Sequence, residues 1–293
     1  MTAVRIKAPA KINLCLHVTG RRPDGYHTLE SLVAFTDFGD TLEIMPADTL
    51  TLNVTGPFAD ALHISKEQNL VMQAASMLRL RTGSTTGARM VLHKQIPVSA
   101  GLGGGSSDAA AALKALYRFW RIDSEDDRVL ERIALKLGSD VPACLAHQAA
   151  WIRGAGEEVK PVSKFPEVFL VLVKPEESLL TRDIYQRFGN KFSFPSKLPD
   201  GFISLDSLVQ AIQPKHNDLH TPAIDLLPVI HNVLGAIHAT RGCLLSRMSG
   251  SGPTCFGVYS SQDEAEQAAA ELRQTYSTWW CMATRLHDWR NAA

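Results

Sequence analysis

The chain has 293 residues, of which 45% are hydrophobic and 20% charged, and its formal net charge is +0 at pH 7. This length allows one large or two moderate domains. The neutral balance argues against a nucleic-acid or membrane partner, and no apolar run is long enough for a membrane span or signal peptide. We therefore expect a cytoplasmic globular protein whose five scattered cysteines are reduced thiols.

The order of predicted elements indicates a β-rich start followed by helices. Alternation of apolar and polar residues predicts one or two strands within residues 4–18, then strands at 29–35, 41–45, 50–54 and 89–93. Helical spacing and stop signals predict helices at 69–81, 107–120 and 124–137, and a short helix at 141–145. Strands at 149–153 and 169–173 follow, and we place a domain boundary near Gly156.

The second half of the chain predicts an α+β sheet covered by helices. Helices are predicted at 181–188, 205–212, 224–239 and 263–276, and strands at 242–247, 254–260 and 279–285, with a Pro-rich connector at 194–199. The expected organisation is an N-terminal ATP-binding domain over residues 1–156 and a C-terminal substrate-side domain over residues 157–293.

Residues 97–112 carry the clearest signal for a ligand. They read PVSAGLGGGSSDAAAA, so that glycines at 101 and 103–105 lead into serines, an aspartate and an alanine run. Alanines favour a helix, serine and aspartate suit its N-terminus, and glycines allow the backbone to approach a ligand closely. This pattern predicts a phosphate-binding loop, although glycine-rich turns before helices are common without one.

Two familiar phosphate motifs do not fit this loop. A Walker A loop requires lysine directly after its last glycine, but the first lysine beyond Gly105 is Lys114. A dinucleotide fingerprint requires G-x-G-x-x-G, and Ser106 stands where the third glycine belongs. The loop therefore belongs to neither of these two motif classes.

Two further stretches accompany the loop, APAKINL at residues 8–14 and MSGSGPT at residues 248–254. In order and separation the three resemble the motifs of the galactokinase, homoserine kinase, mevalonate kinase and phosphomevalonate kinase superfamily. The resemblance spans nearly the whole chain. It implies a two-domain α+β kinase fold with nucleotide and substrate in the cleft between the domains. Pro253 departs from the family's usual small residue and removes an N–H donor from the third motif.

A narrower resemblance rests on PAKINLCLHVTGRRPDGYH at residues 9–27. This stretch is similar to the signature of the 4-diphosphocytidyl-2-C-methyl-D-erythritol kinase family, and homoserine and mevalonate kinases lack its DGYH element. GSDVP at 138–142 and HNDL at 216–219 also fit. The resemblance implies ATP-dependent phosphorylation of a substrate hydroxyl to the 2-phosphate and ADP, in the non-mevalonate (methylerythritol phosphate) route to isoprenoid precursors.

The resemblance also implies the catalytic residues. Asp140 would accept the substrate hydroxyl proton as general base. Lys11 beside it would keep that carboxylate ionised and stabilise charge on the transferring phosphoryl group, without a covalent enzyme intermediate. From the residues alone, simpler interpretations are a helix N-cap for Asp140 and a solvated strand lysine for Lys11.

ATP and Mg²⁺ are the implied cosubstrate and ion. The implied ATP-binding residues are Asn69, Lys94, Pro97, Ser99, Ala100, Gly101, Leu102, Gly103, Gly104, Gly105, Ser106 and Ser107. Asn69 and Lys94 would lie near adenine and ribose, although both could equally be surface residues. Magnesium would be held with ATP by Ser106, Ser107 or water.

The implied substrate-binding residues are Asn13, Tyr26, His27, Thr181, Tyr185, Gly250 and Gly252. The two tyrosines would sandwich the cytosine, and the histidine would contact its polar edge. Stacking of a base on an aromatic ring contributes ~1–3 kcal/mol in single-strand binders. The tyrosines could instead be half-buried core residues, and the two glycines could belong to a simple β-turn.

Three other functions fit the sequence less well. Another small-alcohol kinase of the superfamily is disfavoured by the DGYH element, and a non-catalytic sugar or nucleotide sensor by the presence of Lys11 and Asp140. A nucleic-acid-binding module is disfavoured by the neutral charge balance. We expect only small-molecule partners, and a monomer or weak homodimer.

Overall fold

The computed structural model describes residues 2–62, 65, 67–122, 128–189, 191–197 and 199–287. The chain divides into two compact units. Unit 1 comprises Met1–Ala10, Phe38–Val98 and Gly103–Ala146, and unit 2 comprises Lys11–Asp37, Ser99–Leu102 and His147–Ala293. This interleaved division differs from the predicted single boundary at Gly156, because parts of the first strands and of the glycine loop group with the C-terminal half. Strands β1 (Val4–Arg21) and β2 (His27–Met45) contribute to both units.

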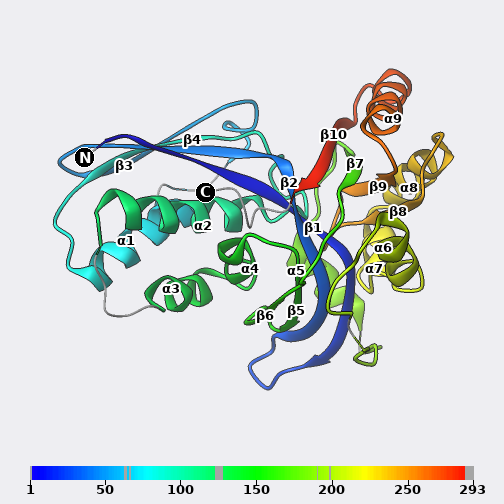
Figure 1. Ribbon diagram of the computed structural model, residues 1–293, viewed down its shortest axis with the longest axis horizontal. Coiled ribbons are helices and arrows are strands. Elements are labelled where there is room, and N and C mark those ends of the chain that lie inside the picture. The colour runs from blue at the N-terminus through cyan, green and yellow to red at the C-terminus, as the bar shows by residue number, and fades with distance from the viewer. Residues whose placement is uncertain are drawn as a thin grey trace. The chain divides into compact units, whose positions relative to one another are not determined.

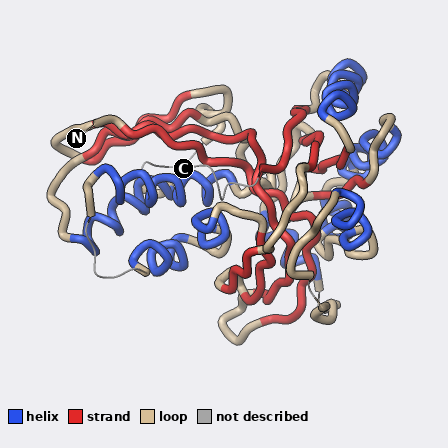
Figure 2. Tube along the Cα trace, in the orientation of Figure 1, coloured by secondary structure: helices blue, strands red, loops and turns tan. Residues whose placement is uncertain are grey.

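In unit 1, helices cover one face of a small sheet (Figures 1 and 2). Strand β4 (Ala88–His93) pairs in parallel with β3 (Leu50–Thr55) and antiparallel with the C-terminal part of β2. The helices that pack on one another are α1 (Leu70–Thr82), α2 (Gly104–Phe119), α3 (Val129–Leu137) and α4 (Val141–Ala146). The alanine run of α2 is buried, and its small side chains let α1 and α4 approach closely.

In unit 2, four antiparallel strands form a sheet in the order β8 (Leu245–Met248), β9 (Cys255–Tyr259), β7 (Val168–Lys174) and β10 (Trp280–His287). Strand β10 also pairs with β2, within the part of β2 that belongs to unit 2. That part of β2 pairs in turn with β5 (Ala150–Gly154), and β5 pairs with β6 (Glu158–Pro161). Helices α8 (Val229–Ala239) and α9 (Gln262–Thr275) lie beside this sheet (Figure 1), and the buried core lies between the strands and the helices.

The helices of unit 2 are α5 (Thr181–Phe188), α6 (Leu205–Ile212), α7 (His220–Leu226), α8 (Val229–Ala239) and α9 (Gln262–Thr275). Helices α6 and α9 each begin at a serine cap. Ser204 accepts a hydrogen bond from the Ser207 N–H, and Ser261 accepts one from the Glu264 N–H. Such caps satisfy N–H groups that have no partner within the helix, which is why local sequence predicts these starts well.

Two predicted elements differ from the structure for identifiable reasons. The strands predicted at 29–35 and 41–45 are one strand, β2. A Cβ at Gly39 would lie 2.5 Å from the Ala8 carbonyl oxygen, so this glycine permits a close strand approach rather than a turn. The helix predicted at 224–239 is two helices, because Pro228 has no N–H for the first and suits the start of the second.

Two smaller differences remain. Strand β6 was not predicted, and α2 begins at Gly104 rather than at residue 107. The first residues of the helix predicted at 124–137 lie outside the described residues, and α3 covers the rest. Within the described ranges, no single helix combines the length and apolar composition needed to cross a membrane. The sharply bent pair α7–α8 meets both criteria only when its two helices are taken together.

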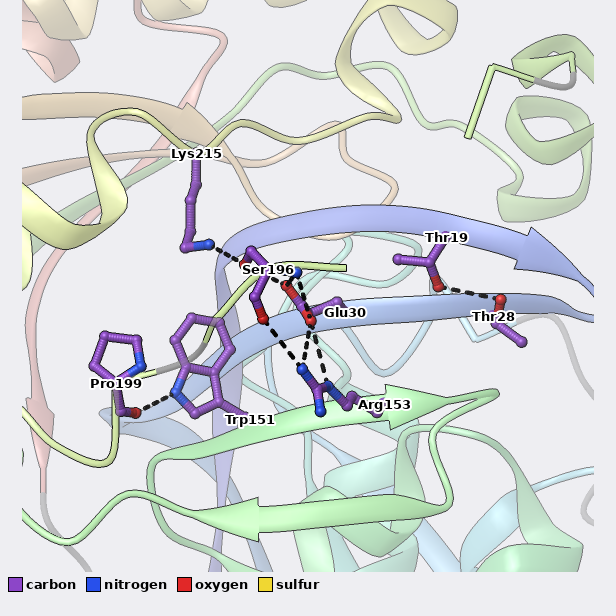
Figure 3. Close-up of polar contacts among 8 residues, drawn as sticks. All are labelled: Thr19, Thr28, Glu30, Trp151, Arg153, Ser196, Pro199 and Lys215. Atoms are coloured by element: carbon purple, nitrogen blue, oxygen red, sulfur yellow. Dashed lines mark hydrogen bonds and ion pairs between the residues drawn. The ribbon is translucent and has the colours of Figure 1, made fainter. Parts of the chain in front are cut away.

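Glu30 on β2 organises a buried polar cluster in unit 2 (Figure 3). Its carboxylate, 2% exposed, accepts hydrogen bonds from the Ser196 N–H at 3.1 Å, the Ser196 hydroxyl at 2.6 Å and Arg153 Nη2 at 2.9 Å. Lys215 Nζ donates to the same hydroxyl and lies 5.6 Å from the Trp151 ring centroid. The connector after α5 is thereby bound to β2 and β5.

These contacts also set the charge state of Glu30. Burial acts to raise the pKa of its carboxyl, but the hydrogen bonds from Ser196 and Arg153 outweigh burial, and the pKa lies below its usual value. A depressed pKa in the folded state stabilises the fold above the ordinary carboxyl pKa, and this contribution is lost as the pH falls through the folded value.

We predict that Glu30→Gln lowers the free energy of unfolding at pH 7 by about 1–3 kcal/mol, because an amide replaces a charged acceptor of several hydrogen bonds. Thermal unfolding should show a lower midpoint for the variant at pH 7 and a smaller difference from the parent near pH 3. The control is Glu167→Gln, whose exposed carboxylate pairs with Arg285 and should contribute little. Equal midpoints of parent and Glu30→Gln at pH 7 would contradict this account.

Candidate functional site

The glycine loop runs into a helix as the sequence predicts, but it enters α2 at Gly103, before the predicted helix start at residue 107. Gly103 has φ +62°, a left-handed conformation that side-chain-bearing residues rarely adopt. The Ser107 N–H donates to the Gly103 carbonyl at 2.9 Å, which begins the helix, and no side chain among the described residues caps it. The first turn, which includes the exposed Gly105, therefore presents backbone N–H groups and the positive end of the helix dipole.

Lys94 lies against the start of this helix, bonded to two carboxylates. Its Nζ donates to Asp108 Oδ2 at 2.8 Å and to Asp40 Oδ2, and all three side chains are at most 4% exposed. A Cβ at Gly104 would lie 3.0 Å from Lys94 Nζ. The ammonium is thus part of the support under the glycine loop.

The two carboxyl groups of this trio have different surroundings. Asp40 also accepts from the Gln95 N–H at 2.5 Å and the Ile96 N–H at 2.8 Å, whereas Asp108 Oδ1 is buried without a hydrogen-bond partner among the described residues. Burial raises the pKa of Asp108 to about 8. Burial opposes the charge on Lys94 as well, but the two carboxylates outweigh it and raise the pKa of the lysine.

The sequence predicts that Lys94 and Asn69 lie near the nucleotide. In the structure, both side chains bond to other residues of the protein. Neither is a surface residue: both are buried. Asn69 Oδ1 accepts from the Val71 N–H at 2.9 Å and caps α1. The sequence analysis missed Asp40, whose place in the turn-like stretch DFGD gave no sign of a buried carboxylate.

Asp140 directly precedes α4. Its carbonyl oxygen accepts from the Cys144 N–H at 3.1 Å, so the residue stands at the helix start that the sequence predicts. Its side chain is half-buried. Both this position and the half-exposed carboxylate are compatible with the predicted general base, which stays a prediction.

In unit 2, Ser249 joins the first motif, the loop and the third motif. Its Oγ accepts from the Asn13 N–H at 3.1 Å and donates to the Gly101 carbonyl at 3.2 Å. The Lys11 N–H donates to the Leu102 carbonyl at 2.8 Å, and the Thr254 N–H donates to the Ala100 carbonyl at 3.3 Å. The structure therefore brings together residues from all three motifs that the sequence singled out.

Lys11 and Asn13 are both buried on β1, each 4% exposed, so Lys11 is not the solvated strand lysine considered above. The Asn13 side chain donates through Nδ2 to Ser31 Oγ at 2.8 Å, but its Oδ1 has no donor among the described residues. This buried acceptor lies beside Gly250, where an added Cβ would come within 3.2 Å of it. A buried polar atom without a partner suits a ligand donor such as a hydroxyl.

Asn217 shapes the third motif. Its Nδ2 donates to the Met248 carbonyl at 2.9 Å and to the Gly250 carbonyl at 2.8 Å. Gly250 and Gly252 have φ +55° and +76°, so both need glycine's conformational freedom. The HNDL stretch contained Asn217, but its sequence neighbourhood gave no sign that it bonds to a turn over 30 residues away.

Three of the other predicted substrate residues, His27, Thr181 and Tyr185, lie at α5. The His27 and Tyr185 rings are stacked, with centroids 4.8 Å apart and planes at 24°. The ring stacked on Tyr185 is therefore that of His27, whereas Tyr26 is 63% exposed. At the helix start, the hydroxyls of Thr181 and Ser251 lie 2.9 Å apart, which connects α5 to the third motif.

Two further loop residues occupy contrasting environments. Pro97 is buried in unit 1, whereas Ser99 in unit 2 is exposed and has φ +53°. A left-handed conformation at a residue with a side chain is uncommon and often accompanies a functional loop.

Comparisons with known proteins agree over nearly the whole chain. The family described as GHMP kinases N terminal domain matches residues 69–148, and GHMP kinases C terminal matches residues 205–278. The 4-diphosphocytidyl-2-C-methyl-D-erythritol kinase of Paramagnetospirillum magneticum is 46% identical over 286 residues, which is 98% of this chain and 99% of that protein.

Solved structures give the same result. A crystal structure of 4-(cytidine 5'-diphospho)-2C-methyl-D-erythritol kinase is similar with a TM-score of 0.79 and 35% identity, over 97% of this chain and 100% of that one. The L. major mevalonate kinase in complex with R-mevalonate has a TM-score of 0.70 at 16% identity, over 98% and 97% of the two chains. The second likeness concerns the fold alone, and it confirms the predicted two-domain α+β class.

We predict that Gly101→Ala destabilises the protein by more than its backbone conformation explains. At φ +72°, a Cβ there would lie 2.6 Å from the Ser249 carbonyl oxygen and 2.7 Å from that of Gly252. The matched control is Gly83→Ala, at φ +67° with nothing within 4 Å, which should cost about 1–2 kcal/mol from the left-handed conformation. Overpacking should add about 1–3 kcal/mol at Gly101. Equal losses in chemical denaturation would contradict the close packing of loop and third motif.

Proposed function

Because this chain belongs to the 4-diphosphocytidyl-2-C-methyl-D-erythritol kinase family within the GHMP kinases, we propose that it transfers the γ-phosphoryl group of ATP to a hydroxyl of 4-diphosphocytidyl-2-C-methyl-D-erythritol. The products are the 2-phosphate and ADP, in the non-mevalonate route to isoprenoid precursors. The observation that carries the proposal is the 46% sequence identity, over 98% of this chain, to a kinase of that name. The helix start at the glycine loop, which no side chain among the described residues caps, supports it.

Phosphoryl transfer requires a grip on the phosphates and a positioned acceptor. The first turn of α2 supplies backbone donors for the phosphates, and Lys94 supports this turn from inside unit 1. Magnesium would arrive with ATP, and hydroxyl oxygens such as those of Ser106 and Ser107 are hard donors of the kind it accepts alongside phosphate oxygens. Among the described residues there is no group of three or more His, Cys, Asp or Glu side chains for a resident ion.

The acceptor hydroxyl needs a base and a binding site. We assign Asp140 as the base that takes the hydroxyl proton as the oxygen attacks the γ-phosphorus, and Lys11 as the residue that stabilises the developing charge. We assign Asn13 as an acceptor for a substrate hydroxyl, because its buried Oδ1 has no donor among the described residues.

The cytidine end is assigned to Tyr26, His27 and Tyr185. Burial lowers the pKa of His27, and nearby Arg21 lowers it further, so the imidazole is neutral at neutral pH. A neutral imidazole has one donor and one acceptor nitrogen. Either nitrogen can therefore bond to one polar group of the base edge, as a donor or as an acceptor.

We also propose that the protein is cytoplasmic and is a monomer or weak homodimer.

We predict that purified protein with Mg-ATP releases ADP in the presence of 4-diphosphocytidyl-2-C-methyl-D-erythritol, and not with homoserine or mevalonate. A coupled ADP assay measures this, and phosphorus NMR of the product identifies the phosphorylated hydroxyl. Turnover of homoserine or mevalonate alone would replace the proposal with another kinase of the superfamily. ATP binding without turnover of any of the three would favour the sensor interpretation.

A second prediction concerns Asp140. The variant Asp140→Asn should keep the fold and both KM values but lower kcat by ~10²-fold or more, because the amide cannot accept the proton. The control is Asp263→Asn, an exposed first-turn aspartate of α9, which should retain parental kcat. An Asp140→Asn enzyme with parental kcat would exclude this residue as the base.

A further inference from the structure

Four aromatic side chains form a continuous row at the cytidine end of unit 2. The His27 ring is stacked on Tyr185, as described above, and it also meets Phe188 edge-on, with centroids 6.1 Å apart and planes at 90°. Phe188 in turn lies against Phe192, at a centroid distance of 6.2 Å. His27 is therefore held on two sides, by one stacked ring and one perpendicular ring.

The end of this row is fixed by hydrogen bonds of the connector after α5. Ser193, directly after Phe192, donates from its N–H to the Val18 carbonyl at 2.9 Å and from its hydroxyl to Asp218 Oδ1 at 3.1 Å. Three residues later, Ser196 is bound to the buried carboxylate of Glu30, as Figure 3 shows. These bonds hold the backbone beside Phe192 on strands β1 and β2.

We propose that Phe188 is a positioning residue, which orients the His27 ring for recognition of the cytosine. The hydrogen-bonded connector keeps the Phe192 ring against Phe188. The proposal rests on the assignment of His27 and Tyr185 to the cytidine end under the proposed function. It adds a residue outside the three sequence motifs to the determinants of base specificity.

The physical reason is that ring orientation decides where the imidazole nitrogens point. Cytosine presents an amino donor next to a ring-nitrogen acceptor, whereas uracil presents a carbonyl acceptor next to an N–H donor. A neutral imidazole that is free to turn could satisfy either pattern by exchanging its nitrogens. A ring held by stacked and edge-on partners has fewer orientations, and aromatic pairs of these geometries are favourable.

Phe188 is suited to this role rather than to holding the core together. Ile184, one turn earlier on α5, is fully buried in the apolar core and anchors the helix. Phe188 is only half-buried at the rim of that core. A leucine at position 188 would keep apolar volume there and remove the ring edge, so the helix should persist.

The test compares Phe188→Leu with the matched control Phe194→Leu. Phe194 lies on the same connector but is 92% exposed, so its replacement should leave the kinetic constants unchanged. Phe188→Leu should raise the KM for the cytidyl substrate roughly three- to tenfold, the scale of one aromatic pair. Its kcat and its KM for ATP should stay at parental values. Its preference for the cytidyl substrate over the uridyl analogue should fall.

Other outcomes overturn the proposal. An unchanged KM for the cytidyl substrate, or an equal rise in the KM for ATP, would make Phe188 a packing residue only. If Phe188→Leu does not fold, Phe192→Leu should give the same selective rise in KM, and a parental KM in that variant would overturn the proposal.

A separate variant tests the underlying function. In Tyr26→Ala the KM for the cytidyl substrate should rise while the KM for ATP stays unchanged. A rise in Tyr26→Ala with a parental KM in Phe188→Leu would overturn this inference and leave the proposed function standing. Absence of turnover of the cytidyl substrate by the parent protein would overturn the proposed function itself.

Discussion

The hydroxyl of Ser249 is the contact on which the site in unit 2 depends. It accepts a hydrogen bond from Asn13, 236 residues away in sequence, and donates one to Gly101, 148 residues away. One small side chain thus fixes the first motif, the glycine loop and the third motif relative to one another. Glycine at 101 is required for this contact, because any side chain there would meet the backbone of the third motif.

The glycine loop is anchored by different physical means on its two sides. Residues 99–102 belong to unit 2 and are held by backbone and hydroxyl hydrogen bonds. From Gly103 onward the chain belongs to unit 1, where the buried trio of Asp40, Lys94 and Asp108 supports the helix start. Two carboxylates around one ammonium are costly to bury. Their position beneath the start of α2 indicates that this cluster supports the glycine loop.

Local sequence predicted the elements whose cause is local. The caps at Asn69, Ser204 and Ser261 lie at the starts of real helices, and the glycine loop runs into α2. Features with a tertiary cause escaped prediction. Gly39 continues a strand because another strand lies against it, and Lys94 is buried because carboxylates distant in sequence surround it. The motifs identified the family, but only the fold shows which of their residues hold the site together.

Helix α5 connects the two ends of the substrate site that the proposed function assigns to unit 2. Before it, the Lys174 ammonium donates to the carbonyls of Pro175, Glu176 and Glu177, which fixes the turn that leads toward the helix. At its start Thr181 meets the third motif, and at its end Phe188 meets His27. One short helix thus carries residues that the proposed function assigns to the base end and a residue bonded to the third motif.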